Sequence, residues 1–395
     1  MRVLHLSWEF PPRIIGGIAS HVFDLSRALA RRGLGVNVMT CSFPEAKRFE
    51  NIDGVNVNRF EAYATADSFL GWALRMQKNM EISSSDLIDE AGGFDVFHAH
   101  DWLSGVAGVG LKHLYRKPLI TTMHSTEYGR RTGIHNDLQA AIHEIEGWIT
   151  YESWRVITCS YYMRSHAAWC FHMPEGKISV IPNGVDVTKF SFSFNYWEVR
   201  NRFANGTEKI ILFVGRLVPE KGLDNLINAL PIILANGVNA KIVVVGDGPQ
   251  KETYQRMAND YGLREKMFFA GHVDDWTLRA LYRVADTTVV PSRFEPFGIV
   301  ALEAMAARCP LVTTTTGGLN EIVDDGGTGL KVPIDDPNAL ARAILRMIRD
   351  PGFKNYAIEN AYRKCLWNYN WDKIAEWTNG LYDAVLSEHN RSTWK

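Results

Sequence analysis

Short runs of β-branched and aliphatic residues recur along the whole chain, each followed by a turn and then by a segment with helical spacing. The first such unit comprises a strand at 2–8, a turn containing Gly16 and Gly17, a helix over 18–32 and a second strand at 36–40. Parallel strands need a crossover that is usually a helix, so this alternation predicts α/β domains with doubly wound, Rossmann-like sheets. Further segments that combine a strand with its turn are expected at 94–101, 119–124, 155–160, 209–215, 241–249, 267–273, 287–291 and 311–318.

With 395 residues, the chain is long enough for two domains with separate cores. Pro182-Asn183-Gly184 is a strong turn signal between the two series of strands, and we expect the hinge there. We therefore predict an N-terminal domain at 1–183 and a C-terminal domain at 184–365. The tail, at 366–395, is expected to contain a helix from about Asn370 to Leu386. Gly329–Val332 is expected to form an edge strand.

Composition excludes several classes of protein. A formal net charge of −1 gives no overall field that favours nucleic acid or an anionic membrane. The five cysteines are widely spaced, which indicates free thiols in a reducing compartment, and we expect a cytoplasmic protein. We expect no signal peptide and no transmembrane helix. Residues 69–91 are amphipathic but poor in basic residues, so we expect a packed surface helix there in preference to a peripheral membrane contact.

The stretch Arg293–Glu303 contains two carboxylates with a helix start between them. Glu295 lies in the turn, Gly298 is near the first helical residue, and Glu303 lies roughly 7 Å further along the axis at about 1.5 Å per residue. Unpaired N–H groups at a helix start attract anions. This pattern favours an elongated ligand with a charged middle, such as a nucleotide-sugar. The alternative is a structural corner in which Glu295 caps the helix and Glu303 is solvated.

Two cations, Arg216 and Lys221, bracket the loop after the strand at 209–215. Ligands of open parallel sheets collect at the carboxyl ends of the strands. Two cations there can neutralise a diphosphate leaving group. The alternative is a solvated loop that happens to contain two basic residues.

A third polar constellation follows two strands of the first domain. His98, His100 and Asp101 end one strand, and His124 ends the next. A His-x-His pair can bind a metal, but no further histidine or cysteine follows at ligand spacing, so we expect no metal. Each histidine can equally be a hydrogen-bonded structural residue.

Several of these motifs resemble known ones. Glu295-Pro-Phe-Gly298 followed by Ala301-Leu-Glu-Ala304 resembles the signature of the family 4 retaining glycosyltransferases, which have the GT-B architecture. The first loop, Ser7 to Gly17, and the run His98-Ala-His-Asp-Trp102 resemble those of the glycogen and α-glucan synthases. In these synthases a lysine usually stands two residues before the glycine pair, where this chain has Ile14.

The resemblance implies a role for each matching residue. The first glutamate of the signature holds donor-sugar hydroxyls and the second holds the ribose, while the main chain of His124 lies against the anomeric centre. The C-terminal helix of such proteins returns to the first domain. The implied catalytic residues are His124, Arg216, Lys221 and Glu295, and the implied acceptor-binding residues are Glu9 and Asp101. The implied donor-binding residues are Gly16, Gly17, Gly246, His272, Val273, Phe297, Gly298, Ile299, Val300 and Glu303.

We therefore expect a retaining transferase that moves a hexose, glucose in the first instance, from a nucleotide-sugar to a glucan or another sugar acceptor without a metal or other cofactor. The first alternative is a mannosyl- or other hexosyltransferase acting on a lipid or glycoconjugate. The second is a trehalose- or sucrose-type synthase. A nucleotide-sugar epimerase, a phosphorylase and a non-catalytic sugar-nucleotide-binding module also remain open.

Overall fold

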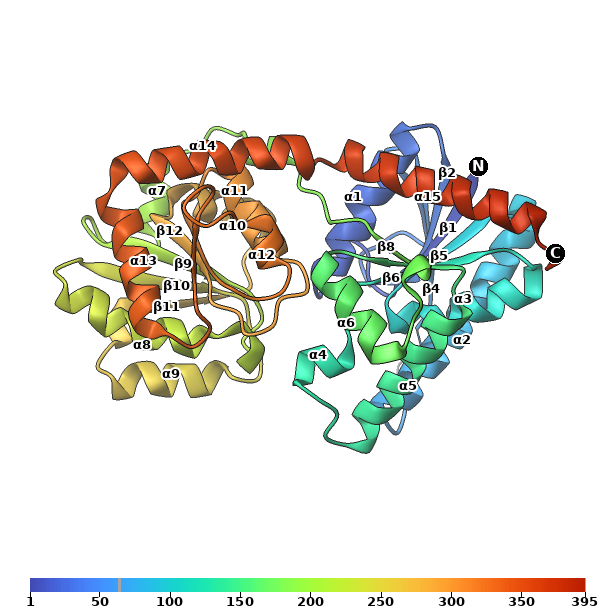
Figure 1. Ribbon diagram of the computed structural model, residues 1–395, viewed down its shortest axis with the longest axis horizontal. Helices are drawn as coiled ribbons and strands as arrows, with labels where there is room; N and C mark the ends of the chain where they lie inside the picture. Colours follow the sequence, from blue (N-terminus) through green and yellow to red (C-terminus); the bar gives the residue numbers. More distant parts are fainter. Residues whose placement is uncertain (63–64, 395) are drawn as a thin grey trace. The chain divides into compact units, whose positions relative to one another are not determined.

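The computed structural model describes residues 1–62 and 65–394, which form two compact units (Figure 1). Unit 1 comprises Met1–Gly184 and Trp371–Lys395, and unit 2 comprises Val185–Asn370. The sequence placed the second boundary five residues earlier, after residue 365. The boundary lies later because helix α14 continues to Asn368 and packs on a helix of unit 2, whereas Trp371 is buried in a core of unit 1.

Among the described residues, unit 1 contains an eight-stranded sheet in the order β3-β4-β2-β1-β5-β6-β7-β8. All neighbouring strands are parallel except β3 and β4. The strands are β1 (Arg2–Leu6), β2 (Gly35–Cys41), β3 (Phe49–Ile52), β4 (Val55–Phe60), β5 (Val96–His100), β6 (Leu119–Met123), β7 (Arg155–Thr158) and β8 (Ile178–Val180). The helices are α1 (Gly17–Arg31), α2 (Phe69–Ala91), α3 (Trp102–Tyr115), α4 (Glu127–Arg131), α5 (Asp137–Glu152), α6 (Tyr161–Phe171) and α15 (Trp371–Arg391).

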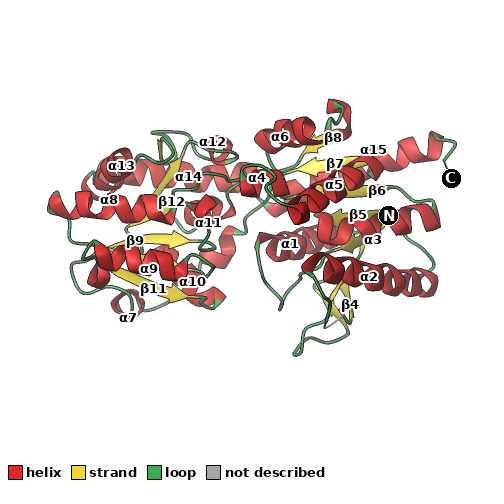
Figure 2. Ribbon diagram, turned by 90° about the horizontal axis from the view of Figure 1, so that it is seen from below, coloured by secondary structure: helices red, strands yellow, loops and turns green. Residues whose placement is uncertain are grey.

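The sheet of unit 1 is covered on both faces, because successive residues of a strand point to opposite sides. In β1, Val3 belongs to the core that α1 and α15 cover, whereas Leu4 belongs to the core that α2, α3 and α5 cover. Figure 2 shows the strands of unit 1 flanked by helices. From α15, Ile374 and Tyr382 are fully buried. Burial of an aliphatic or aromatic side chain of this size stabilises a fold by roughly 1.5–3 kcal/mol, which holds the C-terminal helix in unit 1.

Unit 1 differs from the sequence prediction in two places. The strand at 155–160 was expected to be the last of the domain, but β8 pairs with β7 beyond it. A three-residue strand carries too little alternation to be distinguished from an exit loop. The second difference is the β3–β4 hairpin, whose turn residues Asp53 and Gly54 both have positive φ. Asp-Gly is a strong hairpin signal, and it could have revealed this pair of strands.

Unit 2 contains, among its described residues, a six-stranded parallel sheet in the order β11-β10-β9-β12-β13-β14. As predicted, the strand near residue 330 lies at the edge. The strands are β9 (Lys209–Val214), β10 (Ala240–Val245), β11 (Met267–Gly271), β12 (Thr287–Val290), β13 (Leu311–Thr314) and β14 (Leu330–Val332). The helices are α7 (Tyr196–Asn201), α8 (Leu223–Ala235), α9 (Lys251–Asp260), α10 (Asp275–Val284), α11 (Ile299–Ala306), α12 (Leu319–Ile322), α13 (Pro337–Arg349) and α14 (Pro351–Asn368).

The main core of unit 2 lies between one face of this sheet and helices α8, α9 and α13. Helix α10 packs against β9, and α11 packs against β12 and β13. The parallel strands bring the loops that follow β9, β10, β12 and β13 to one edge of the sheet, where ligands of such sheets bind.

Helix α2 is the amphipathic stretch at 69–91. Its Met76 and Met80 are fully buried in the core, so one face of the helix packs on the sheet. No helix in the described part of the chain is both long enough and apolar enough to cross a membrane.

Candidate functional site

In unit 1, the glycine loop before α1 is held by a buried carboxylate. Glu9 is 1% exposed, and its Oε2 accepts hydrogen bonds from the backbone N–H groups of Ile15 (2.6 Å) and Gly16 (2.9 Å). Burial raises the pKa of Glu9, while these backbone hydrogen bonds lower it. Glu9, predicted to contact an acceptor, thus shapes the loop. Gly16 precedes α1 and Gly17 begins it, so both predicted donor-loop glycines lie at a helix start.

Asp101 lies directly after β5 and has a positive φ of 58°. It is buried, and its Oδ1 accepts a hydrogen bond from the backbone N–H of His124 at 2.7 Å. The predicted acceptor residue and the predicted catalytic histidine therefore meet at the ends of two adjacent strands. Burial raises the pKa of Asp101 to about 6, and the nearby Arg130 guanidinium opposes that rise.

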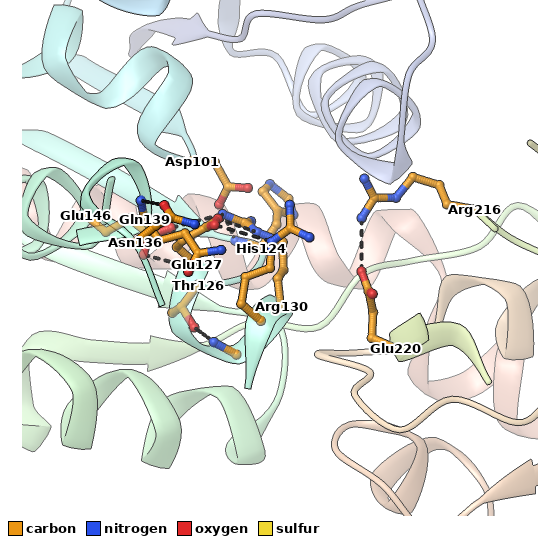
Figure 3. Close-up of polar contacts among 12 residues, drawn as sticks. Asp101, His124, Thr126, Glu127, Arg130, Asn136, Gln139, Glu146, Arg216 and Glu220 are labelled. Carbon is orange, nitrogen blue, oxygen red and sulfur yellow. Dashed lines mark hydrogen bonds and ion pairs between the residues drawn. The ribbon is translucent and has the colours of Figure 1, made fainter. Parts of the chain in front are cut away.

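A buried charged cluster beside Asp101 was not predicted from the sequence. The backbone N–H of Glu127 donates to both carboxylate oxygens of Glu146, at 3.0 and 2.9 Å. Arg130 donates to Glu127 (3.1 Å) and to Glu146 (3.3 Å). Figure 3 shows these side chains gathered near Asp101 and His124. Burial raises the pKa of Glu146 to about 8, and Arg130 again opposes the rise. Nothing in the spacing of Glu127 and Glu146 marked them as partners, since α4 and α5 come together only in the fold.

Four histidines of unit 1, His5, His98, His100 and His124, lie in one closely packed group. Nε2 of His124 lies 3.3 Å from Nδ1 of His100, whose Nε2 lies 3.0 Å from Nδ1 of His5. The ring of His98 uses both nitrogens, one with the hydroxyl of Tyr382 (2.6 Å) and one with that of Thr122 (2.7 Å). Burial lowers the pKa of each of these histidines, and His5 and His124 reach about 3, so the rings are neutral at physiological pH.

The sequence offered no third histidine at ligand spacing, but the fold supplies several. Ring nitrogens of His5, His98 and His100 lie within 4.8 Å of one another, as do those of His21, His100 and His124. Neutral imidazoles can bind metals. The hydrogen bonds described above nevertheless account for both ring nitrogens of His98 and of His100 without a metal.

In unit 2, the loop after β9 carries the predicted cations. Arg216 is largely exposed and pairs with Glu220 at 3.4 Å (Figure 3). The Nζ of Lys221 lies 2.7 Å from Oε2 of Glu295, which follows β12. The loop continues through Gly222, which has a positive φ of 68°, and a Cβ there would lie 2.0 Å from the carbonyl oxygen of Pro291. Glycine is therefore required to bring the two loops together.

Glu295 does not cap α11. Its carboxylate accepts hydrogen bonds from the Lys221 ammonium and, at 3.3 Å, from the hydroxyl of Ser292. The N-cap position of α11 is occupied by Gly298. The carbonyl of Glu295 accepts a hydrogen bond from Gly318, and a Cβ at Gly318 would lie within 2.7 Å of the backbone of Pro296 and Phe297. The loop after β13 thus packs against the backbone of the Glu295 turn and supports it.

The first turn of α11 presents backbone N–H groups to the carboxyl-end loops. Gly298 has a positive φ of 116°, and a Cβ there would lie 2.6 Å from the side chain of Leu319. The first N–H groups of a helix lack partners within the helix, and the predicted donor residues Ile299 and Val300 lie in this turn. The side chain of Phe297 is buried against Tyr369.

Glu303 is not a solvated helix residue. Its Oε2 accepts a hydrogen bond from the hydroxyl of Tyr282 on α10 at 2.8 Å. Burial raises the pKa of Glu303 to about 7, and the Tyr282 hydrogen bond lowers it. Tyr282 is a polar partner that the sequence analysis did not find.

The remaining predicted donor residues lie at the ends of β10 and β11. Gly246 has a positive φ of 123°, and a Cβ there would lie 2.1 Å from the carbonyl oxygen of Gly215. His272 and Val273 follow β11 directly, and His272 is exposed. The structure therefore brings the ends of β9, β10 and β11 to one edge of the unit 2 sheet, as expected for a nucleotide site.

Comparison with known proteins identifies the family. The model described as Glycosyltransferase Family 4 matches residues 15–189, and that described as Glycosyl transferases group 1 matches residues 196–364. An uncharacterized glycosyltransferase of Methanocaldococcus jannaschii is 39% identical over 99% of this chain and 100% of its own length. The glycogen synthase of Mycobacterium tuberculosis is 34% identical over 98% of this chain and 95% of its own.

A solved structure agrees with these matches. Sucrose-phosphate synthase from Thermosynechococcus elongatus superposes with a TM-score of 0.83 and 25% identity, covering 98% of this chain and 99% of the other. The two α/β units therefore agree with the family models that match both halves and with the near full-length relatives. The chain belongs to the family 4 glycosyltransferases of the GT-B fold.

Proposed function

We propose that this glycosyltransferase moves glucose from a nucleotide-sugar to an α-glucan or α-glucoside acceptor, with retention of configuration and without a metal. One observation carries the proposal. Lys221 and Glu295 meet at 2.7 Å beside the first turn of α11, which places a cation, a carboxylate and a helix N-terminus at the carboxyl ends of adjacent strands.

The donor half of the mechanism rests on unit 2. Arg216, Lys221 and the first turn of α11 stabilise the charge that develops on the diphosphate as its bond to the anomeric carbon breaks. Glu295 accepts hydrogen bonds from the donor sugar and orients the anomeric carbon. Glu303 accepts hydrogen bonds from the ribose hydroxyls, and Tyr282 holds its carboxylate in place.

The acceptor half rests on unit 1. An acceptor hydroxyl attacks the anomeric carbon on the face that the diphosphate leaves, and its proton passes to a departing phosphate oxygen. The main chain of His124, held by Asp101, lies against the anomeric centre. In this scheme no protein carboxylate forms a bond to the sugar.

The glucose and glucan assignment is supported by the glycogen synthase relative, together with the glucan-synthase-like loops Ser7–Gly17 and His98–Trp102. A second candidate, a synthase that uses a small-sugar acceptor, is favoured by the structural likeness to sucrose-phosphate synthase. We also propose that the protein works in the cytoplasm, because none of its five cysteines forms a disulfide in the described structure.

The deciding experiment incubates the protein with ADP-, UDP- and GDP-sugars, with and without glucan primers and small sugars, and follows donor cleavage and product formation. We expect an ADP- or UDP-glucose to be consumed with a primer and to yield α-linked glucose, identified by the anomeric proton coupling. Selective use of GDP-mannose refutes the glucose assignment, a small-sugar product favours the second candidate, and a β-linked product refutes retention. The Glu295→Gln variant serves as the background control.

A further inference from the structure

The two places where the chain passes between the units lie next to one buried aromatic side chain. The passages are at Gly184/Val185 and Asn370/Trp371. Trp371 begins α15, is 7% exposed, and belongs to the core beneath α1. A Cβ on Gly184 would lie 2.7 Å from the Trp371 ring, so the indole lies directly on the backbone of the first passage. Both passages therefore adjoin this ring, Gly184 through its contact with the indole and Trp371 as the residue that carries it.

From Trp371, aromatic contacts lead to the candidate catalytic residue. The ring of Trp371 meets that of His21 edge to face, with centroids 5.6 Å apart. The ring of His21 meets that of His124 in the same way at 4.7 Å. These three side chains come from α15, α1 and the loop after β6. No sequence pattern relates these three segments.

His21 is held mainly by these ring contacts. It is 4% exposed, and within the described structure neither of its ring nitrogens has a hydrogen-bond partner of good geometry. Asn183, from the turn before the first passage, is also buried, and its side chain raises the pKa of His21 against the larger lowering by burial. The two groups are thus close without a well-formed hydrogen bond. His124 is in turn tied to the histidine network by a 3.3 Å hydrogen bond to His100, which is long for a strong one.

We propose that His21 is a positioning residue through which the hinge sets the position of the His124 loop, by way of Trp371. This inference rests on the proposed function, because His124 is there placed at the reacting sugar. When the passages at 184 and 371 change conformation, the indole shifts, the His21 ring follows, and the His124 loop is brought into or out of its working position. Displacement of a positioned group by about 1 Å can lower a rate a hundredfold.

The first test compares kcat, donor KM and thermal midpoint among hinge-path variants. His21→Ala, Trp371→Ala and Gly184→Ala should each lower kcat at least tenfold while donor KM stays within about twofold. His21→Phe and Trp371→Phe keep a ring and should recover most of kcat. The matched control is His389→Ala. His389 is also buried in unit 1, where it packs on Trp154 and pairs with the carbonyl of Arg116, away from the hinge.

The double variant His21→Ala/Trp371→Ala provides the sharper criterion. Residues that act through one path are non-additive, so the double variant should lose no more kcat than the worse single variant. Additive losses overturn the proposal, and so does a kcat for His21→Ala that matches His389→Ala. If His21→Ala and Trp371→Ala do not fold, the phenylalanine variants and Gly184→Ala decide: kcat within twofold of wild type in Gly184→Ala, with both phenylalanine variants impaired, also overturns the proposal.

A second readout needs neither donor nor turnover, and therefore separates this inference from the proposed function. In protein with labelled histidines, the His124 ring resonance should shift in Trp371→Phe and Gly184→Ala and stay unchanged in His389→Ala. An unshifted resonance in both hinge variants contradicts the coupling, whatever the donor panel shows. A shifted resonance in a protein that cleaves no nucleotide-sugar supports the coupling while the proposed function fails.

Discussion

The ammonium nitrogen of Lys221 lies 2.7 Å from a carboxylate oxygen of Glu295, although the two residues are 74 positions apart. Both side chains are largely buried, and the loops that carry them touch through Gly222 and Pro291. The fold therefore holds together the cation that we propose for the diphosphate and the carboxylate that we propose for the sugar hydroxyls.

The two signature glutamates should differ in kinetic effect. In the proposed mechanism Glu295 contacts the reacting ring and its interaction strengthens towards the transition state, so Glu295→Gln should mainly lower kcat. The same mechanism assigns Glu303 to the ribose, which does not change during the reaction, so Glu303→Gln should mainly raise donor KM. Loss of a hydrogen bond to a charged group costs about 1.5–3 kcal/mol, or roughly ten- to a hundredfold. Steady-state kinetics check this, and a kcat within twofold of wild type in Glu295→Gln contradicts the catalytic role.

Donor binding should weaken at acidic pH because of Glu303. Burial raises its pKa to about 7, so below that pH the free enzyme carries a protonated side chain that accepts ribose hydroxyls poorly. We expect kcat/KM for the donor to fall as the pH drops below about 7, since this ratio reports ionisations of the free enzyme. The profile should flatten in Glu303→Gln. Tyr282→Phe should move the inflection to higher pH, because the Tyr282 hydrogen bond lowers the pKa of Glu303.

Stability should decrease with rising pH through Glu146. Its pKa is about 8 in the folded protein and near 4.5 as a free side chain, so the folded state binds the proton more tightly. The stabilisation from the protonated form is complete below about pH 4.5 and is lost as the pH rises towards 8, with a slope of at most about 1.4 kcal/mol per pH unit. Denaturant titrations across this range should show a smaller decrease in Glu146→Gln. Equal slopes for the two proteins contradict the assignment.

Transfer should be independent of metal. In the proposed mechanism, Arg216, Lys221 and the first turn of α11 supply positive charge where the diphosphate leaves. Activity should persist after exhaustive EDTA treatment, with the metal content of the treated protein measured as a control because the buried histidines offer nitrogen ligands. A loss of activity that Mg²⁺ or Mn²⁺ restores refutes the prediction.

The units should close on the donor about the hinge near Pro182–Val185 and the start of α15. Donor and acceptor are assigned to different units, and transfer requires them to meet. Small-angle scattering should show a smaller radius of gyration with saturating nucleoside diphosphate. Identical profiles with and without the nucleotide contradict closure.

The sequence by itself determined the α/β alternation, most of the strands of both halves, several of the helices and the motif that led to the family. Those features are local: periodicity decides which segments are strands, and Gly298 and the Glu295 turn lie within a few residues of each other. The prediction missed β8, because its local signal is short. It also missed the two strands of the β3–β4 hairpin, because the Asp53-Gly54 turn signal was not used.

Only the tertiary structure decided which side chains meet. Tyr382 reaches His98 across 284 residues, Tyr282 holds Glu303, and His21 lies between Trp371 and His124. Spacing along the chain carries no information about such pairs, because they depend on the order of strands in a parallel sheet and on which helix returns to cover it. The residue types alone therefore indicated the chemistry of the candidate site. The side chains that hold those residues in place could be identified only from the fold.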